Sequence, residues 1–217
     1  MSIKENLSSV LKTIPDSVTL VAVSKTKPVS DLQQAYDEGQ RIFGENRVQE
    51  MTEKWERMPK DIQWHMIGHL QRNKVKYMAE YVTLIHGVDS PRLLKEINKQ
   101  AEKYHRTISC LLQVHIAEEE TKFGFDEQEL IDLVNTQEFK GYKNVKLVGL
   151  MGMATFTEDM NQVRREFKSL QSLFKKLKIN YPDFNTLSMG MSGDYQVAIE
   201  EGSNMVRIGS SIFGSRN

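Results

Sequence analysis

The sequence predicts a single-domain α/β protein in which eight parallel strands close into a (β/α)8 barrel. Three observations support this fold class. Short apolar runs recur eight times in 217 residues, segments with helical patterns separate them, and no Pro-rich, Gly-rich or low-complexity linker divides the chain. Alternating strands and helices are typical of parallel sheets, and eight alternations in one chain favour a closed barrel. An open doubly wound sheet is the alternative arrangement.

The apolar runs are the expected buried strands, because strands covered on both faces form nearly continuous apolar segments. They cover residues 19–24, 41–44, 62–67, 82–86, 107–114, 145–151, 185–189 and 205–209. A barrel of this kind typically has about 250 residues, so a chain of this length must have short loops and no second domain. We therefore expect residues 1–217 to form one domain.

Three helices are expected from apolar spacing and capping residues. The first precedes strand one and covers the barrel seam usually covered by a last helix, since only eight residues follow the eighth strand. Its apolar positions are Ile3, Leu7, Val10, Leu11 and Ile14. A second helix is expected after a capping box formed by Ser30 and Gln33. A third helix has an apolar stripe formed by Val163, Phe167, Leu170, Phe174 and Leu177. Its C-terminal end is basic, with Lys175, Lys176 and Lys178.

Charge, hydropathy and cysteine content exclude several classes of protein. The 29 Lys and Arg residues balance 29 Asp and Glu residues, so no basic field is present to bind nucleic acid or an anionic membrane. The first ten residues lack the pattern of a secretory signal, and no run approaches the roughly 20 apolar residues of a membrane span. We expect a cytoplasmic protein. Cys110, the only cysteine, lies in an apolar run and is expected in the core, which excludes disulfides.

Lys25 directly follows the first expected strand, at the barrel end where this fold places its chemistry. The apolar residues 21–23 precede it. Apolar neighbours disfavour the ammonium form and favour the neutral amine that attacks an aldehyde. Lys25 is therefore a candidate for a Schiff base. The alternative is a solvated loop lysine beside Lys27.

Two segments with small residues follow strands seven and eight, at 190–194 and 209–211. Backbone N–H groups in such segments can bind an oxyanion, and the loops after strands seven and eight are the usual phosphate site of barrels. Either segment alone is more typical of an ordinary turn or helix cap. Together they indicate a phosphate site.

Arg207 lies inside the eighth strand, on the face opposite its two apolar neighbours. Because a closed barrel makes strand eight adjacent to strand one, Arg207, Lys25 and the phosphate site meet at one rim. A lysine, a phosphate site and a guanidinium together describe a pocket for pyridoxal phosphate. The alternative is that Arg207 pairs with a carboxylate such as Glu200 or Glu201.

The chain also resembles a family, the pyridoxal phosphate homeostasis proteins, whose barrel is similar to the N-terminal domain of alanine racemase. The resemblance extends along nearly the whole chain in ordered blocks, which makes it highly specific. The blocks are VAVSKTKP (21–28), GENRVQE (44–50), HMIGHLQRNK (65–74), SMGMSGD (188–194) and VRIGSSIFG (206–214). The resemblance implies that Lys25 forms the internal aldimine and that Arg207 faces the pyridine nitrogen. It implies further cofactor contacts from Ser192, Gly209 and Ser210 to the phosphate and from Asn46 in the same pocket.

Three other residues, Lys122, His65 and His69, are candidates for chemistry. Lys122 matches a family position near the cofactor, where the lysine could accept or relay pyridoxal phosphate. An exposed loop lysine is an equally good interpretation. His65 and His69 have the i, i+4 spacing of metal ligands, which converges only on a helix. Gly68 and the preceding strand pattern place them at a strand-to-loop junction instead, so no metal is expected, and His65 is expected to form a hydrogen bond near the barrel mouth.

Two functions from different classes remain. The first is a cofactor-handling protein that binds pyridoxal phosphate at Lys25, acts in its homeostasis or delivery, contacts apo-enzymes transiently and is a monomer without its own reaction. The alternative is an amino-acid racemase, which needs a second acid/base that, as the resemblance implies, alanine racemases obtain from an additional domain and a partner subunit. A third hypothesis, a Schiff-base aldolase, shares the lysine and the phosphate site. Arg207 and the family blocks count against it.

Overall fold

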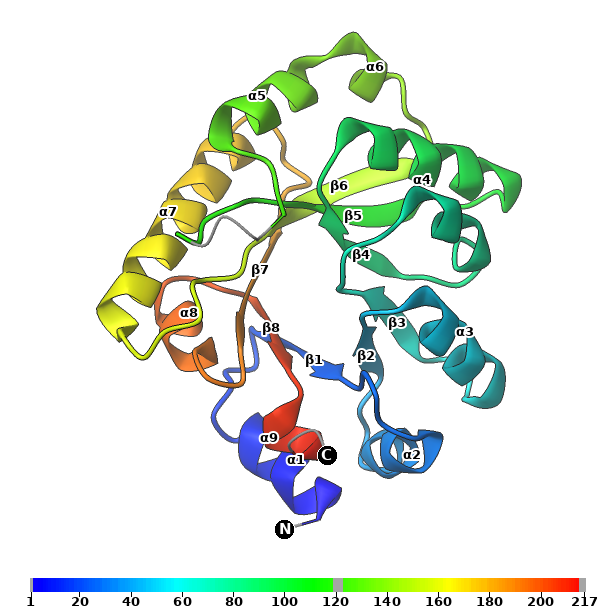
Figure 1. Cartoon of the computed structure of the whole chain (residues 1–217), viewed down its shortest axis with the longest axis vertical. Helices are drawn as coiled ribbons and strands as arrows, with labels where there is room; N and C mark the ends of the chain where they lie inside the picture. Colours follow the sequence, from blue (N-terminus) through cyan, green and yellow to red (C-terminus); the bar gives the residue numbers. More distant parts are fainter. Residues whose placement is uncertain (1, 119–122, 215–217) are drawn as a thin grey trace.

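The computed structural model describes residues 2–118 and 123–214. Its strands are all parallel and form a closed barrel in which each pairs with its neighbours in chain order and β8 pairs with β1 (Figure 1). The strands are β1 Thr19–Val23, β2 Ile42–Glu45, β3 Gln63–Met66, β4 Leu84–Val88, β5 Ile108–Gln113, β6 Val145–Met151, β7 Thr186–Met191 and β8 Met205–Ile208. The predicted closed barrel is confirmed, and the open doubly wound sheet is wrong.

Helices surround the barrel and connect its strands (Figure 1). They are α1 Ile3–Leu11, α2 Val29–Asp37, α3 Val48–Arg57, α4 Pro91–Lys103, α5 Glu127–Asn135, α6 Gln137–Lys140, α7 Met160–Lys178, α8 Tyr195–Glu200 and α9 Ser210–Phe213. Between β3 and β4 the connection is the 3-10 helix η1 Arg72–Tyr77, which shortens this part of the chain. The short connections explain how a barrel forms from fewer residues than is typical.

The N-terminal helix is confirmed, and it begins with a capping box between Ser2 and Glu5. Leu7 and Val10 face the core, and α1 packs beside α9 at the end of the chain (Figure 1). The capping box predicted at Ser30 and Gln33 is wrong. Helix α2 begins earlier, after Pro28, which has an extended backbone, so Ser30 already lies inside the first turn.

The core has two layers. The larger one packs the outer faces of the strands against the helices. The smaller one fills the barrel interior, and its buried residues all lie on strands. They are Val21, Leu84, Leu111, Met151 and Met205. Cys110 belongs to the outer layer, and burial raises the pKa of its thiol, as expected for a core cysteine. The described helices include none with the length and apolar character needed to cross a bilayer.

Candidate functional site

A cavity of about 680 Å³ opens at the carboxyl ends of the strands. This is the end of the barrel at which proteins of this fold place their sites. All six residues predicted for the cofactor line it, namely Lys25, Asn46, Ser192, Arg207, Gly209 and Ser210. Barrel closure therefore brings together positions that are up to 185 residues apart in the sequence, the separation of Lys25 and Ser210.

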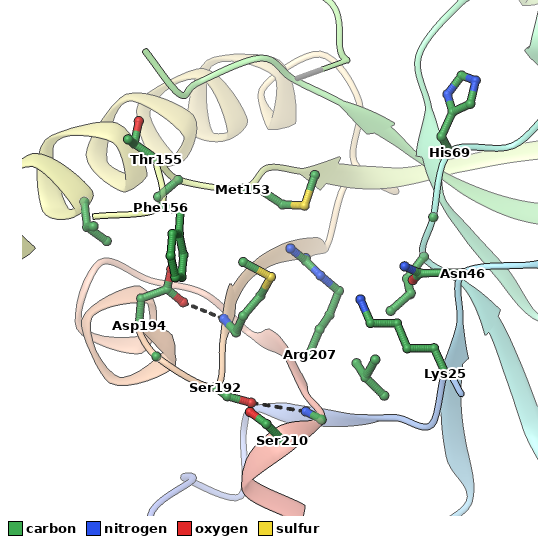
Figure 2. A pocket seen from close by; sticks show the side chains of 18 of the residues that line it. Lys25, Asn46, His69, Met153, Thr155, Phe156, Ser192, Asp194, Arg207 and Ser210 are labelled. Atoms are coloured by element: carbon green, nitrogen blue, oxygen red, sulfur yellow. Dashed lines mark hydrogen bonds between the residues drawn. The ribbon is translucent and has the colours of Figure 1, made fainter. Parts of the chain in front are cut away.

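Lys25 follows β1 and extends into the cavity toward Arg207, as Figure 2 shows. The residue before it, Ser24, is fully buried. The residue after it, Thr26, has a left-handed backbone with φ of 64°, which is rare for a β-branched residue. The chain thus turns sharply at Lys25 as it leaves the barrel.

Arg207 is buried in the barrel wall, with only 4% of its surface exposed. Its guanidinium donates to the Ser188 carbonyl at 2.9 Å, to Ser188 Oγ at 2.6 Å and to the Gly152 carbonyl at 3.1 Å. Burial lowers the pKa of Arg207 to about 10, against the opposing influence of Asp194. The group therefore stays charged at neutral pH while its protein acceptors are neutral oxygens.

The alternative ion pair of Arg207 with Glu200 or Glu201 is wrong. Both carboxylates accept from Arg164, at 2.5 Å each. They lie at the end of α8, whereas Arg207 points into the barrel. The strand alternation expected for Arg207 is thus correct, because its side chain faces the barrel interior, whereas Glu200 and Glu201 pair with Arg164 at the end of α8.

A chain of buried polar side chains extends from Arg207 through the barrel, and sequence reasoning missed two of its members. Ser188 Oγ lies 3.1 Å from His86 Nδ1, and His86 Nε2 lies 3.1 Å from His65 Nδ1. Burial lowers the pKa of His65 to about 3 and that of His86 well below its usual value. Both rings are therefore neutral, and they support Ser188, to which Arg207 donates.

The expected hydrogen bond of His65 is confirmed, with His86 as its partner. His69 instead pairs with Asp89 at 2.9 Å and stacks on Phe123. The two histidines do not converge on one point. Among the described residues, no group of three His, Cys, Asp or Glu side chains is placed to bind a metal.

The loops after β7 and β8 lie in contact. Gly209 N donates to Ser192 Oγ at 3.2 Å, and Ser210 lies beside them (Figure 2). A Cβ atom at Gly209 would lie 3.0 Å from the Val23 carbonyl, so this glycine allows the β8 loop to approach β1 closely. The two hydroxyls are neutral donors of the kind that binds a phosphate, and the Gly209 N–H group could join them by exchanging Ser192 Oγ for a phosphate oxygen.

The boundary of the β7 loop differs from the prediction. Residues 190 and 191 belong to β7, and Gly190 has a positive φ of 95° beside a register shift between β7 and β8. A Cβ at Gly190 would approach Ala198 Cβ to 2.6 Å, so glycine lets α8 pack against the strand end. Asp194 closes the turn by accepting from Met191 N at 2.6 Å. Lys122 lies outside the described residues.

Comparisons with known proteins place these features in a family. The model of the alanine racemase N-terminal domain matches residues 1–217. The pyridoxal phosphate homeostasis protein of Pasteurella multocida is 39% identical, with 100% of this chain and 99% of that protein covered. The homologous protein of Aquifex aeolicus is 42% identical, with 91% and 86% covered.

Solved structures agree with this assignment. PipY of Synechococcus elongatus, solved with PLP bound, superimposes with a TM-score of 0.90 at 33% identity, covering 98% of this chain and 100% of that chain. Alanine racemase of Clostridium difficile superimposes with a TM-score of 0.77 at 15% identity, covering 99% of this chain and 56% of that chain, which shows a shared fold alone. The chain therefore belongs to the alanine racemase N-terminal domain family and, within it, to the pyridoxal phosphate homeostasis proteins.

Proposed function

We propose that this protein binds pyridoxal phosphate covalently through Lys25 and acts in the intracellular homeostasis and delivery of that cofactor, without a dedicated reaction. The observation that carries the proposal is that Lys25, Arg207 and the two loops that contain Ser192 and Ser210 all line one cavity. A relative that is 39% identical and covers the whole of this chain bears the name pyridoxal phosphate homeostasis protein, and PipY has been solved with PLP bound.

Each chemical group of the cofactor has a suitable partner in the cavity. Lys25 would hold the cofactor through its amine, which can condense with an aldehyde with loss of water. Ser192, Gly209 and Ser210 supply the hydroxyl and N–H donors for the phosphate. Arg207 faces the ring nitrogen, since a guanidinium can only donate and an unprotonated ring nitrogen can only accept. Asn46 lines the same cavity.

Arg207 also accounts for the absence of a dedicated reaction in this proposal. Pyridoxal phosphate supplies an electron sink for carbanion chemistry, and the sink is strongest when a carboxylate keeps its ring nitrogen protonated. A charged guanidinium favours the unprotonated ring instead. Racemases with an arginine at this place add a second base, and we propose that none of the described residues of this chain acts as one. We propose that the protein is a monomer whose protein contacts are transient encounters with apo-enzymes.

The test that separates this proposal from an amino-acid racemase is steady-state turnover. The purified protein loaded with pyridoxal phosphate should show little racemisation, decarboxylation or transamination of the common amino acids. Activity would be followed by chiral chromatography of the products, with an authentic racemase as the positive control. Turnover of about 1 per second or faster, within the ordinary range of enzymes, would overturn the proposal in favour of an enzyme.

A further inference from the structure

A buried cluster of charged side chains lies behind Lys25, on the outer face of the barrel. It consists of Glu45 at the end of β2, Lys54 on α3 and Glu50 on α3. Their side chains are 0%, 6% and 23% exposed. None of the three lines the cofactor cavity. The cluster therefore lies between the strands and α3, where direct contact with a bound cofactor is excluded.

The cluster bonds the residue that precedes Lys25. Lys54 Nζ donates to the Ser24 carbonyl at 2.8 Å, and Ser24 Oγ donates to Glu45 Oε1 at 2.5 Å. Both the backbone and the side chain of Ser24 are thereby fixed. The Ser24 carbonyl and Lys25 N belong to the same planar peptide unit, which ends at Lys25 Cα. This contact therefore fixes the orientation of the peptide plane that carries the Lys25 side chain.

The same cluster bonds the residue that follows Lys25. Glu50 Oε1 accepts from Thr26 N at 2.6 Å and from Lys54 Nζ at 2.7 Å. Thr26 is the residue with the left-handed backbone. Such a conformation is strained for a β-branched residue and persists only where surrounding contacts hold it. Glu50 supplies such a contact.

Lys54 completes the cluster by donating also to Glu45 Oε1 at 2.7 Å. Its three donated bonds, to Ser24, Glu45 and Glu50, use the three hydrogens of an ammonium group. An amine engaged in this way has no lone pair with which to attack an aldehyde, so Lys54 does not compete with Lys25. Burial raises the pKa of Glu45, and the Lys54 charge opposes that effect.

We propose that Glu45, Lys54 and Glu50 are positioning residues that hold the peptide groups on both sides of Lys25 and so fix its reactive amine in the cavity. The inference rests on the proposed function of Lys25. Simple fold stabilisation is a poor explanation for the cluster, because buried ion pairs contribute little net stability compared with apolar packing. Its bonds to Ser24 and Thr26, the two residues adjacent to Lys25, give it a specific task.

Two ligands separate positioning from general structural support. Pyridoxal phosphate can bond to Lys25, whereas pyridoxine 5′-phosphate has the same ring and phosphate but no aldehyde. Glu50→Ala removes the acceptor for Thr26 and Lys54, and Glu50→Gln keeps a neutral acceptor. Lys54→Met removes the shared donor. Asp61→Asn is the control, since Asp61 is bonded by Tyr36 and Arg41 on the surface near β2.

Stopped-flow absorbance measures covalent attachment of pyridoxal phosphate, and calorimetry measures affinity for pyridoxine 5′-phosphate. We expect Glu50→Ala to slow attachment roughly tenfold, because small displacements of a reacting group are costly. Glu50→Gln should be slowed less. Affinity for pyridoxine 5′-phosphate should stay within about twofold, since the proposed contacts of its phosphate and ring nitrogen lie on the β7–β8 side of the cavity. The Asp61→Asn variant should match the wild type with both ligands.

The Glu50 variants keep the test decisive if Lys54→Met fails to fold. Unchanged attachment in Glu50→Ala would overturn the inference, and so would an equal loss of affinity for both ligands, which indicates general distortion. Failure of the proposed function has a different signature. In that case the wild type itself attaches no cofactor at Lys25 after borohydride reduction, and both proposals fall together.

Discussion

The β1–β2 side of the cavity and the β7–β8 side hold their charged residues in opposite ways. On the β1–β2 side, a buried ionic cluster bonds the backbone on either side of Lys25. On the β7–β8 side, neutral oxygens bond the guanidinium of Arg207 itself. The difference fits the chemistry of each residue. A lysine that forms a covalent bond uses its amine in the reaction, and the ionic cluster bonds the backbone on either side of it. An arginine that only donates can be fixed at its tip.

The largest effect on stability should come from replacing Arg207, whose guanidinium is hydrogen-bonded to the barrel wall. Arg207→Leu leaves the buried Gly152 carbonyl and Ser188 Oγ without this donor, whereas the Ser188 carbonyl still accepts from Gly152 N. Each bond lost in this way costs about 1 to 3 kcal/mol. We expect the free energy of unfolding in urea to fall by about 3 kcal/mol. The control is Lys95→Leu, which loses an exposed ion pair with Glu138 and should cost about 1 kcal/mol or less. Equal losses in both variants would contradict the account of the β7–β8 side.

The histidines that support this side predict an acid-sensitive fold. His65 and His86 are neutral in the folded protein, with the pKa of His65 at about 3. Below about pH 6.5 the unfolded chain binds more protons, so stability falls as the pH falls from 6.5 toward 3. Each histidine should contribute a slope approaching about 1.4 kcal/mol per pH unit.

Urea unfolding between pH 6.5 and 5 measures this slope. The His65→Gln variant should show a smaller slope than the wild type, because one of the two titrating groups is gone. His69→Gln serves as the control, since His69 lies at the surface beside Asp89. A wild-type stability that does not change over this pH range would contradict the neutral, buried pair.

A smaller effect is expected from the hydroxyls of the phosphate loops. Ser192→Ala and Ser210→Ala each remove one donor, at a cost on the order of 1 to 3 kcal/mol in cofactor affinity if the bond is charge-assisted. The absorbance of the bound cofactor at saturation should be unchanged, because Lys25 is untouched. Ser172→Ala, on the exposed face of α7, is the control. Unchanged dissociation rates in both loop variants would place the phosphate elsewhere.

The comparison also shows what the sequence could predict. The strands were predictable because buried parallel strands are continuous apolar runs, and the ends of those runs located Lys25 and the phosphate loops. Two errors in the strand ends, those of β4 and β7, lie at glycines. Strand β4 continues through Gly87, where a Cβ would lie 2.7 Å from the Gly68 carbonyl, so the glycine permits close strand packing and does not end the strand.

The supporting residues were harder to predict. His86 and Ser188 lie 102 residues apart and meet only when the barrel closes. A polar residue inside a buried strand signals that a partner exists, but it does not identify the partner. Lys54 was missed for a related reason. On the sequence it is one of several charged residues of an amphipathic helix, and its burial against Ser24 follows from the way α3 packs on the barrel.

The central claim, covalent binding of pyridoxal phosphate at Lys25, is tested most directly by one measurement on the wild type. After addition of the cofactor, the protein should develop a visible absorbance band that borohydride abolishes, and peptide mass mapping should find the reduced cofactor on Lys25. The Lys25→Ala variant should show neither signal while remaining folded. A wild type that stays colourless with added cofactor, or a label fixed on another lysine, would contradict the account.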